Sequence, residues 1–199
     1  EPMLRFVREV SLSGKRPARE LYNARGWCLH HNSDLWRYSY TGGAHAQHAF
    51  WPVGGAWVCQ HLWEHFAFSG DREFLAEALP LMKDAAAFLL GFMTENGQGQ
   101  LATCPSTSPE NSFLEPGSEE RASVCEGSAM DMTMIRELFE NILEGSLLLG
   151  QQDAVVDEVR SAYDRLAMPL IGDDGRLLEF SIEAVEPEPS HRHVSHLYG

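Results

Sequence analysis

The chain has 199 residues, of which 44% are hydrophobic, and its formal net charge is −14 at pH 7. This length suits one domain or a part of a larger one. We expect no nucleic-acid partner, because phosphate binding needs clustered Lys and Arg, and no membrane partner, because no run approaches the roughly 18 apolar residues of a spanning helix.

Nothing in the sequence assigns the chain to a compartment. Its first residues, EPMLRFVREV, lack the charged start and apolar run of a signal peptide. None of the four cysteines forms a CxxC pair, so neither a zinc ribbon nor a redox motif is indicated. There is also no GxGxxG, Walker or GxSxG motif, and we therefore expect no cofactor and no serine-esterase chemistry.

The first half of the chain shows mostly helical periodicity. Residues 1–10 predict one helix, and Pro17 fits the first turn of a second helix. A further helix is expected over 52–68, where Gly70 follows as its end and Asp71 can cap the next helix.

The second half continues the helical pattern. Residues 72–94 predict an amphipathic helix, but Pro80 inside it predicts a kink or a break. Ser128, followed by Asp131 three residues later, is typical of the capped start of a long helix, which Gly150 is expected to end. A last helix is expected over 153–167, and no strand pattern of any length is present.

Helices joined alternately by short turns and long loops predict an all-α fold. The long loops are expected at about 30–50, 97–127 and 172–199. Such an order favours a ring of helical hairpins or a solenoid. Because the chain starts and stops inside this pattern, we expect residues 1–199 to be a fragment, about three hairpins cut from one larger catalytic domain.

Two stretches at the ends of the first long loop carry aromatic residues beside hydrogen-bonding ones. The stretch 27–37 reads WCLHHNSDLWR, and Trp51 precedes its helix next to Pro52. A sugar ring needs both an aromatic face and paired donors and acceptors, so these are candidate sugar-binding segments. The alternative for 27–37 is a polar loop that covers a helix end.

Histidine clusters raise the alternative of a metal site. His61 and His65 are four residues apart, a spacing that can bind zinc, but the Glu of HLWEH is not where an HExxH motif needs it. The stretch 186–198, EPEPSHRHVSHLY, holds three histidines around Arg192. Arg192 and His193 are equally suited to donate hydrogen bonds to sugar hydroxyls.

The stretch 104–113, CPSTSPENSF, carries one carboxylate, Glu110, on a loop stiffened by two prolines. A carboxyl group held rigidly suits a general acid, which must reach the leaving oxygen with little reorganisation, and burial can raise its pKa. The alternative is a surface glutamate in a proline turn.

Four stretches together resemble one family. HHNSDLWR, AFWPVGGAWVCQHLWEH with the following SGDREFL turn, CPSTSPENSF and HRHVSHLYG occur in this order and at similar spacing in bacterial glycoside hydrolase family 95. The resemblance covers nearly the whole chain. Members of this family are inverting α-L-fucosidases that typically act on fucose α1,2-linked to galactose, and some act on L-galactose.

The resemblance implies an (α/α)6 barrel of helical hairpins with the site in its mouth, of which this chain would be about half. It implies that Glu110 is the general acid. It also implies that Trp51 and the region of Asn32 and Asp34 line the sugar or aglycone pocket, and that Arg192 and His193 contact the substrate, a fucosylated oligosaccharide or glycan.

The family's water-activating residues lie in motifs that are not present here, an asparagine pair upstream and an aspartate downstream. Asp131 and Glu179 are available carboxylates, but nothing marks either as the base. We therefore expect residues 1–199 alone to be inactive and poorly folded. Two departures from the family pattern are Phe180, where Trp is frequent, and Cys104, where Ser is common.

The sequence leaves two other functions open. One is a non-catalytic carbohydrate-binding relative, which would keep Trp51, Arg192 and His193. The other is a metal-dependent hydrolase that uses the histidine clusters.

Overall fold

The structure of the protein is a computed structural model, which describes residues 2–198. It is predominantly helical, with four very short strands. The helices are α1 (Pro2–Tyr22), α2 (Ala46–Ala49), α3 (Gly54–Ser69), α4 (Arg72–Phe92), α5 (Ala129–Leu149), α6 (Ala154–Tyr163) and a 3-10 turn, η1 (Ser195–Leu197). The strands are β1 (Met93–Glu95), β2 (Leu101–Thr103), β3 (Phe113–Leu114) and β4 (Arg121–Ala122).

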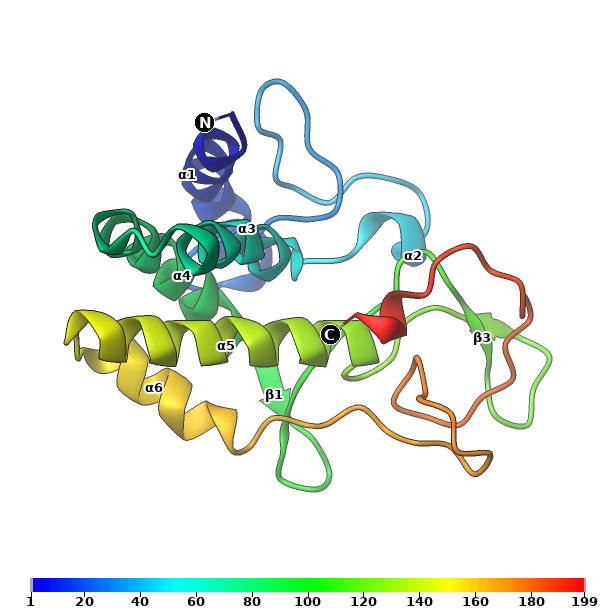
Figure 1. Cartoon of the computed structure of the whole chain (residues 1–199). Coiled ribbons are helices and arrows are strands. Elements are labelled where there is room, and N and C mark those ends of the chain that lie inside the picture. Colours follow the sequence, from blue (N-terminus) through cyan, green and yellow to red (C-terminus); the bar gives the residue numbers. More distant parts are fainter. Residues whose placement is uncertain (1, 199) are drawn as a thin grey trace.

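Two helical hairpins form the body of the molecule. Helices α3 and α4 make the first, α5 and α6 make the second, and α1 packs on α3 and α4. Figure 1 shows α5 running across the molecule below α3 and α4, with α6 beneath it. The predicted helical hairpins are thus confirmed, although the described residues contain two hairpins and a separate α1 where three hairpins were expected.

The turns of both hairpins are built as predicted. Gly70 ends α3 with a φ of 66° and Gly150 ends α5 with a φ of 64°, the left-handed conformation that favours glycine. The Asp71 carboxylate then caps α4 by accepting hydrogen bonds from the backbone N–H groups of Glu73 and Phe74, both at 3.0 Å. These short turns hold neighbouring helices side by side.

Neither proline interrupts its helix. α1 is one continuous helix through Pro17, and α4 continues through Pro80, so the predicted helix start and the predicted break are both wrong. In each helix the buried stripe crosses the proline: Val10, Gly14 and Ala18 are buried in α1. The packing of that stripe offsets the cost of about 3 kcal/mol that a proline imposes inside a helix.

The loop over 97–127 contains the strands that sequence periodicity missed. β1 pairs with β2 and β3 pairs with β4, both antiparallel. Segments of two or three residues are too short to establish a period of two, which explains why no strand was predicted. The first pair brings the chain from the end of α4 back to the first turn of α5.

The core positions the site through α5. Its inward face belongs to one buried cluster with α4, which includes Leu79, Met82, Leu138, Phe139 and Ile142, all fully buried. The last residues of the chain, in red in Figure 1, pass over the first turns of α5 near the short helix α2. None of the helices within residues 2–198 has the length and apolar character needed to cross a bilayer.

Candidate active site

The SPEN loop, residues 104–112, follows β2 and is held at several points. Ser106 exchanges two backbone hydrogen bonds of 2.8 Å with Cys125, and the Asn111 N–H donates to the Ser108 carbonyl at 2.8 Å. The Thr107 hydroxyl donates to the Phe50 carbonyl at 2.6 Å. The predicted stiffness of this loop therefore comes from buried hydrogen bonds as well as from its prolines.

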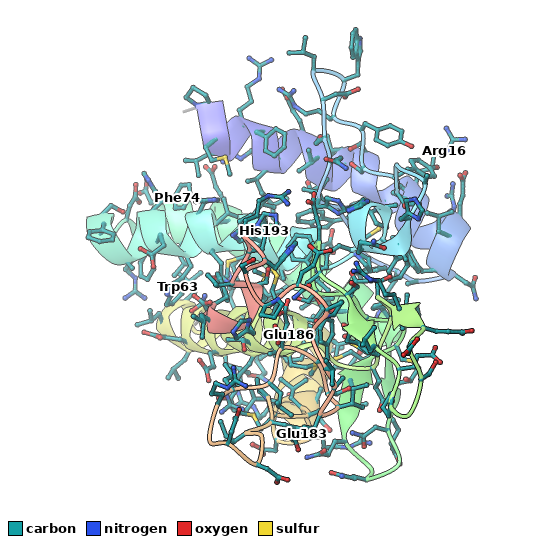
Figure 2. The ribbon with its side chains drawn as sticks, turned by 90° about the vertical axis from the view of Figure 1, so that its right-hand side faces the viewer. Arg16, Trp63, Phe74, Glu183, Glu186 and His193 are labelled. Carbon is teal, nitrogen blue, oxygen red and sulfur yellow. The ribbon has the colours of Figure 1, made fainter. Side chains whose placement is uncertain are left out.

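Glu110 meets two residues of the C-terminal segment. The Arg192 guanidinium donates to the Glu110 carboxylate, and the His193 Nε2 atom lies 3.7 Å from the same oxygen. The Ser195 hydroxyl donates to the Pro109 carbonyl at 3.0 Å, which joins the two segments next to this contact. The structure thus brings together three of the six predicted site residues, although 82 positions separate Glu110 from Arg192. Figure 2 shows His193 near the centre of the face toward the viewer.

The electrostatic setting of Glu110 differs from the expected one. Its hydrogen bond with Arg192 holds the pKa of the Glu110 carboxyl below its ordinary value, and the nearby imidazoles of His193 and His48 act in the same direction. Burial raises this pKa by less than Arg192 lowers it, because the side chain keeps 29% of its exposure. The expectation that burial raises the pKa is therefore wrong for this arrangement, in which Glu110 is paired and ionised.

Trp51 does not offer its ring to a ligand in this structure. Its side chain is 1% exposed, and its indole N–H donates to Asp131 Oδ1 at 2.8 Å. Trp57 packs edge-on against it, with ring centroids 5.6 Å apart, and is 46% exposed. Trp51 is thus buried in this structure, and its place in the lining of a sugar pocket stays a prediction, while Trp57 presents an accessible indole beside it.

Asn32 and Asp34 lie on the exposed loop before α2. Asp34 Oδ1 accepts hydrogen bonds from the backbone N–H groups of Trp36 and Tyr38, at 2.9 and 3.0 Å, and so shapes its own turn. Within residues 2–198 no hydrogen bond or ion pair joins Asn32 or Asp34 to Glu110. Their part in a sugar pocket stays a prediction.

Asp131 is a buried carboxylate under the SPEN loop. It is 1% exposed and accepts hydrogen bonds from Trp51, from the Thr103 hydroxyl at 2.9 Å and from the Ser106 hydroxyl at 2.6 Å. Desolvation raises the pKa of Asp131 to about 6, against the effect of these three donors. The sequence signal was an acidic residue inside the apolar run AMDMTMI. From the sequence alone, this residue was interpreted as part of the capped start of α5.

Glu179 is a second buried carboxylate that sequence reasoning left without a role. It accepts hydrogen bonds from Ser108 and Asn111, one on each side of Glu110. Its signal was similar, a lone acidic residue in the apolar stretch LLEFSI. Both carboxylates are almost fully buried and accept hydrogen bonds from neighbouring side chains, so neither is exposed to solvent in this structure.

The histidines of the described residues contact single carboxylates at most, as His193 contacts Glu110. Across the described part of the chain, no group of three or more His, Cys, Asp or Glu side chains is placed to hold a metal ion. His65 packs its ring on Phe74, with centroids 4.3 Å apart, and His193 packs on His191 at 5.4 Å.

Comparison with known proteins assigns the chain to a family. The model of the glycosyl hydrolase family 95 catalytic domain matches residues 1–199. The chain is 38% identical over 201 residues to "Alpha-L-fucosidase 2" of Arabidopsis thaliana, and 28% identical over 208 residues to "Probable alpha-fucosidase A" of Aspergillus niger. Each match covers 100% of this chain, but only 24% and 25% of the relatives, so the chain spans about a quarter of their length.

The fold is also shared with a solved structure. "Putative kojibiose phosphorylase from human microbiome" superimposes with a TM-score of 0.63 at 14% identity, over 86% of this chain and 24% of that one. At this identity the likeness concerns the helical fold alone. The two named relatives are a plant and a fungal protein, whereas the motif resemblance was to bacterial members of the family.

Proposed function

The chain belongs to glycosyl hydrolase family 95, and on that premise we propose that the protein hydrolyses α-L-fucosidic bonds in an oligosaccharide or glycan. The bond proposed is fucose α1,2-linked to galactose, cleaved with inversion. Both curated relatives are named as fucosidases, which supports the sugar; the linkage and the stereochemistry rest on the resemblance of the motifs.

The observation that carries the proposal is the meeting of Glu110 with Arg192 and His193. Glu110 would act as the general acid and protonate the glycosidic oxygen as the bond to fucose breaks. Arg192 and His193 are donors, so they suit the hydroxyl groups of the sugar. A carboxylate on an anchored loop beside two such donors is an arrangement in which leaving group and sugar can be held together.

The low pKa of Glu110 requires that substrate binding change its surroundings. If a sugar hydroxyl takes over the guanidinium of Arg192, the carboxylate loses its main stabilising partner. Filling the site with sugar also removes water from around the carboxyl group, which favours the protonated form. The proposed acid would therefore gain its proton as the substrate binds.

The water-activating group is proposed to come from residues outside 1–199. An inverting glycosidase needs a base about 6.5–9.5 Å from the acid, on the other face of the sugar. Asp131 and Glu179 are buried beneath the loop and hydrogen-bonded to it, which supports a base elsewhere. In this proposal residues 1–199 belong to one (α/α)6 barrel domain and are inactive by themselves.

The test is fucose release from 2′-fucosyllactose by the full-length protein that carries this sequence. Glu110→Gln should lower kcat by about 10²–10⁴-fold, the range that general-acid catalysis contributes. The matched control is Glu115→Gln, an exposed glutamate five positions farther along the same segment, which should keep wild-type activity. Equal activity of wild type and Glu110→Gln would refute the assignment, and binding without any release by wild type would favour the non-catalytic sugar-binding relative.

A further inference from the structure

Glu179 occupies a buried position directly behind the proposed acid. Its side chain keeps only 2% of its exposure. Oε1 accepts a hydrogen bond of 2.6 Å from the Ser108 hydroxyl, and Oε2 accepts one of 2.9 Å from Asn111 Nδ2. Ser108 stands two positions before Glu110 and Asn111 stands one position after it. Glu179 is therefore hydrogen-bonded to the loop on both sides of Glu110.

Glu179 is itself fixed to the body of the molecule. Its backbone carbonyl accepts a hydrogen bond of 3.0 Å from the Ala129 N–H, in the first turn of α5. The Asn111 amide cannot turn over freely, because its oxygen accepts a 2.8 Å hydrogen bond from the Ser112 N–H. Asn111 must therefore present a donor to Glu179, and a carboxylate oxygen is an acceptor that suits it.

The same carboxylate also reaches the segment that carries the sugar-facing donors. The His196 Nδ1 atom lies 3.5 Å from Glu179 Oε2 and makes no hydrogen bond within the described residues. His196 stands three positions after His193 and four after Arg192. One buried group thus contacts both of the segments that meet at Glu110.

We propose that Glu179 is a positioning residue: from behind the SPEN loop it sets the place of the Glu110 carboxyl relative to the leaving oxygen and keeps the Arg192 segment in register. This inference rests on the proposed function of Glu110. A displacement of about 1 Å in a reacting group can cost on the order of 10²-fold in rate, so loosening this grip should lower catalysis without removing any group that touches substrate.

The variant Glu179→Gln tests the proposal. It keeps the size of the side chain, but its amide supplies one acceptor and one donor group, so it cannot accept from both Ser108 and Asn111. To keep both attachments, the Ser108 hydroxyl, which can also accept, would have to turn from donor to acceptor. The hydrogen bonds of the carboxylate would then be replaced by weaker ones to a neutral amide, so the loop should be held less firmly while the helices stay folded.

The readout compares two substrates of the full-length protein. Release of galactose or lactose from the fucosyl bond needs a proton from the acid, whereas fluoride from α-L-fucosyl fluoride leaves as an anion and depends little on it. For Glu179→Gln we expect kcat on 2′-fucosyllactose to fall about 10–100-fold, with much less change in KM and in the rate on the fluoride. A merely structural defect would lower both rates together.

Two further variants keep the result interpretable. Ser108→Ala removes one attachment and little volume, and should show the same selective loss to a smaller degree even if Glu179→Gln folds poorly. Glu183→Gln is the matched control, because Glu183 holds the Asp173 N–H at 3.1 Å in the same segment and lies well below His193 in Figure 2; it should behave as wild type.

The outcomes separate this inference from the function on which it rests. Suppose that Glu110→Gln loses activity on 2′-fucosyllactose. If Glu179→Gln and Ser108→Ala then keep this activity, or lose activity on both substrates to the same degree, the positioning role of Glu179 is overturned. The assignment of Glu110 as the acid is unaffected by that result. If Glu110→Gln itself is as active as wild type, the proposed function fails first.

Discussion

Replacing Asp131 by Asn should change how the stability of the protein depends on pH. Asp131 is 1% exposed and its pKa is raised from 3.8 to about 6 in the folded chain by desolvation. Between these two values the folded state holds a proton that the unfolded state has lost. Asp131 therefore contributes stability that is fully present below pH 3.8 and is lost as the pH rises through 6.

The size of this effect follows from the two pKa values. A difference of 2.2 units (6 minus 3.8) corresponds to about 3 kcal/mol in the free energy of unfolding, at about 1.4 kcal/mol per unit. Roughly 2 kcal/mol of this falls between about pH 4.5 and 7.5. Asn does not titrate, so the stability of Asp131→Asn should improve relative to wild type by that amount over this interval, whatever the cost of its altered hydrogen bonds at a single pH.

Urea unfolding of both proteins at several pH values measures this difference. The control is Asp164→Asn, which removes an exposed carboxylate at the end of α6 and reports the effect of losing one charge. If the unfolding free energies of wild type and Asp131→Asn run parallel from pH 4.5 to 7.5, burial does not disfavour the ionised form of Asp131, and a raised pKa for this carboxyl is refuted.

Two further predictions concern the proposed reaction. Arg192→Met removes the group that lowers the pKa of Glu110, so the alkaline limb of the kcat/KM profile should move to higher pH while kcat/KM itself falls; an unmoved limb would show that Arg192 does not control the acid. Dialysis against a chelator should leave fucose release unchanged within error, as expected for carboxylate chemistry; a loss that added zinc restores would favour the metal-dependent alternative.

Local rules predicted the scaffold where one residue decides the outcome. Gly70, Asp71 and Gly150 set their turns through left-handed backbone and capping, which depend on neighbours in sequence. Pro17 and Pro80 were misjudged because tertiary burial on both sides of each proline outweighs a local preference. That balance cannot be read from a single segment.

The candidate site shows the same division between features that sequence patterns predict and features that depend on tertiary contacts. Motif resemblance placed Glu110, Arg192 and His193 in one site, and the structure brings these three side chains into contact; their roles stay a proposal. It could not distinguish the accessible Trp57 from the buried Trp51, since both stand in one aromatic stretch and only the packing against Asp131 separates them. Asp131 and Glu179 were overlooked as loop supports because their partners lie 25 to 80 positions away in the chain.

The segment after α6 has a consequence for the behaviour of the protein on heating. Beyond Tyr163 its only helix within the described residues is the short turn η1, and it is joined to the body by scattered bonds such as Tyr198 to Glu137 at 2.8 Å and Ser195 to Pro109. Such a segment can open locally at a free energy well below that of global unfolding. Opening would carry Arg192 away from Glu110 while the helical hairpins stay intact. If the proposed activity holds, this local opening would set the temperature at which it is lost, and thermal inactivation would precede the loss of helical signal.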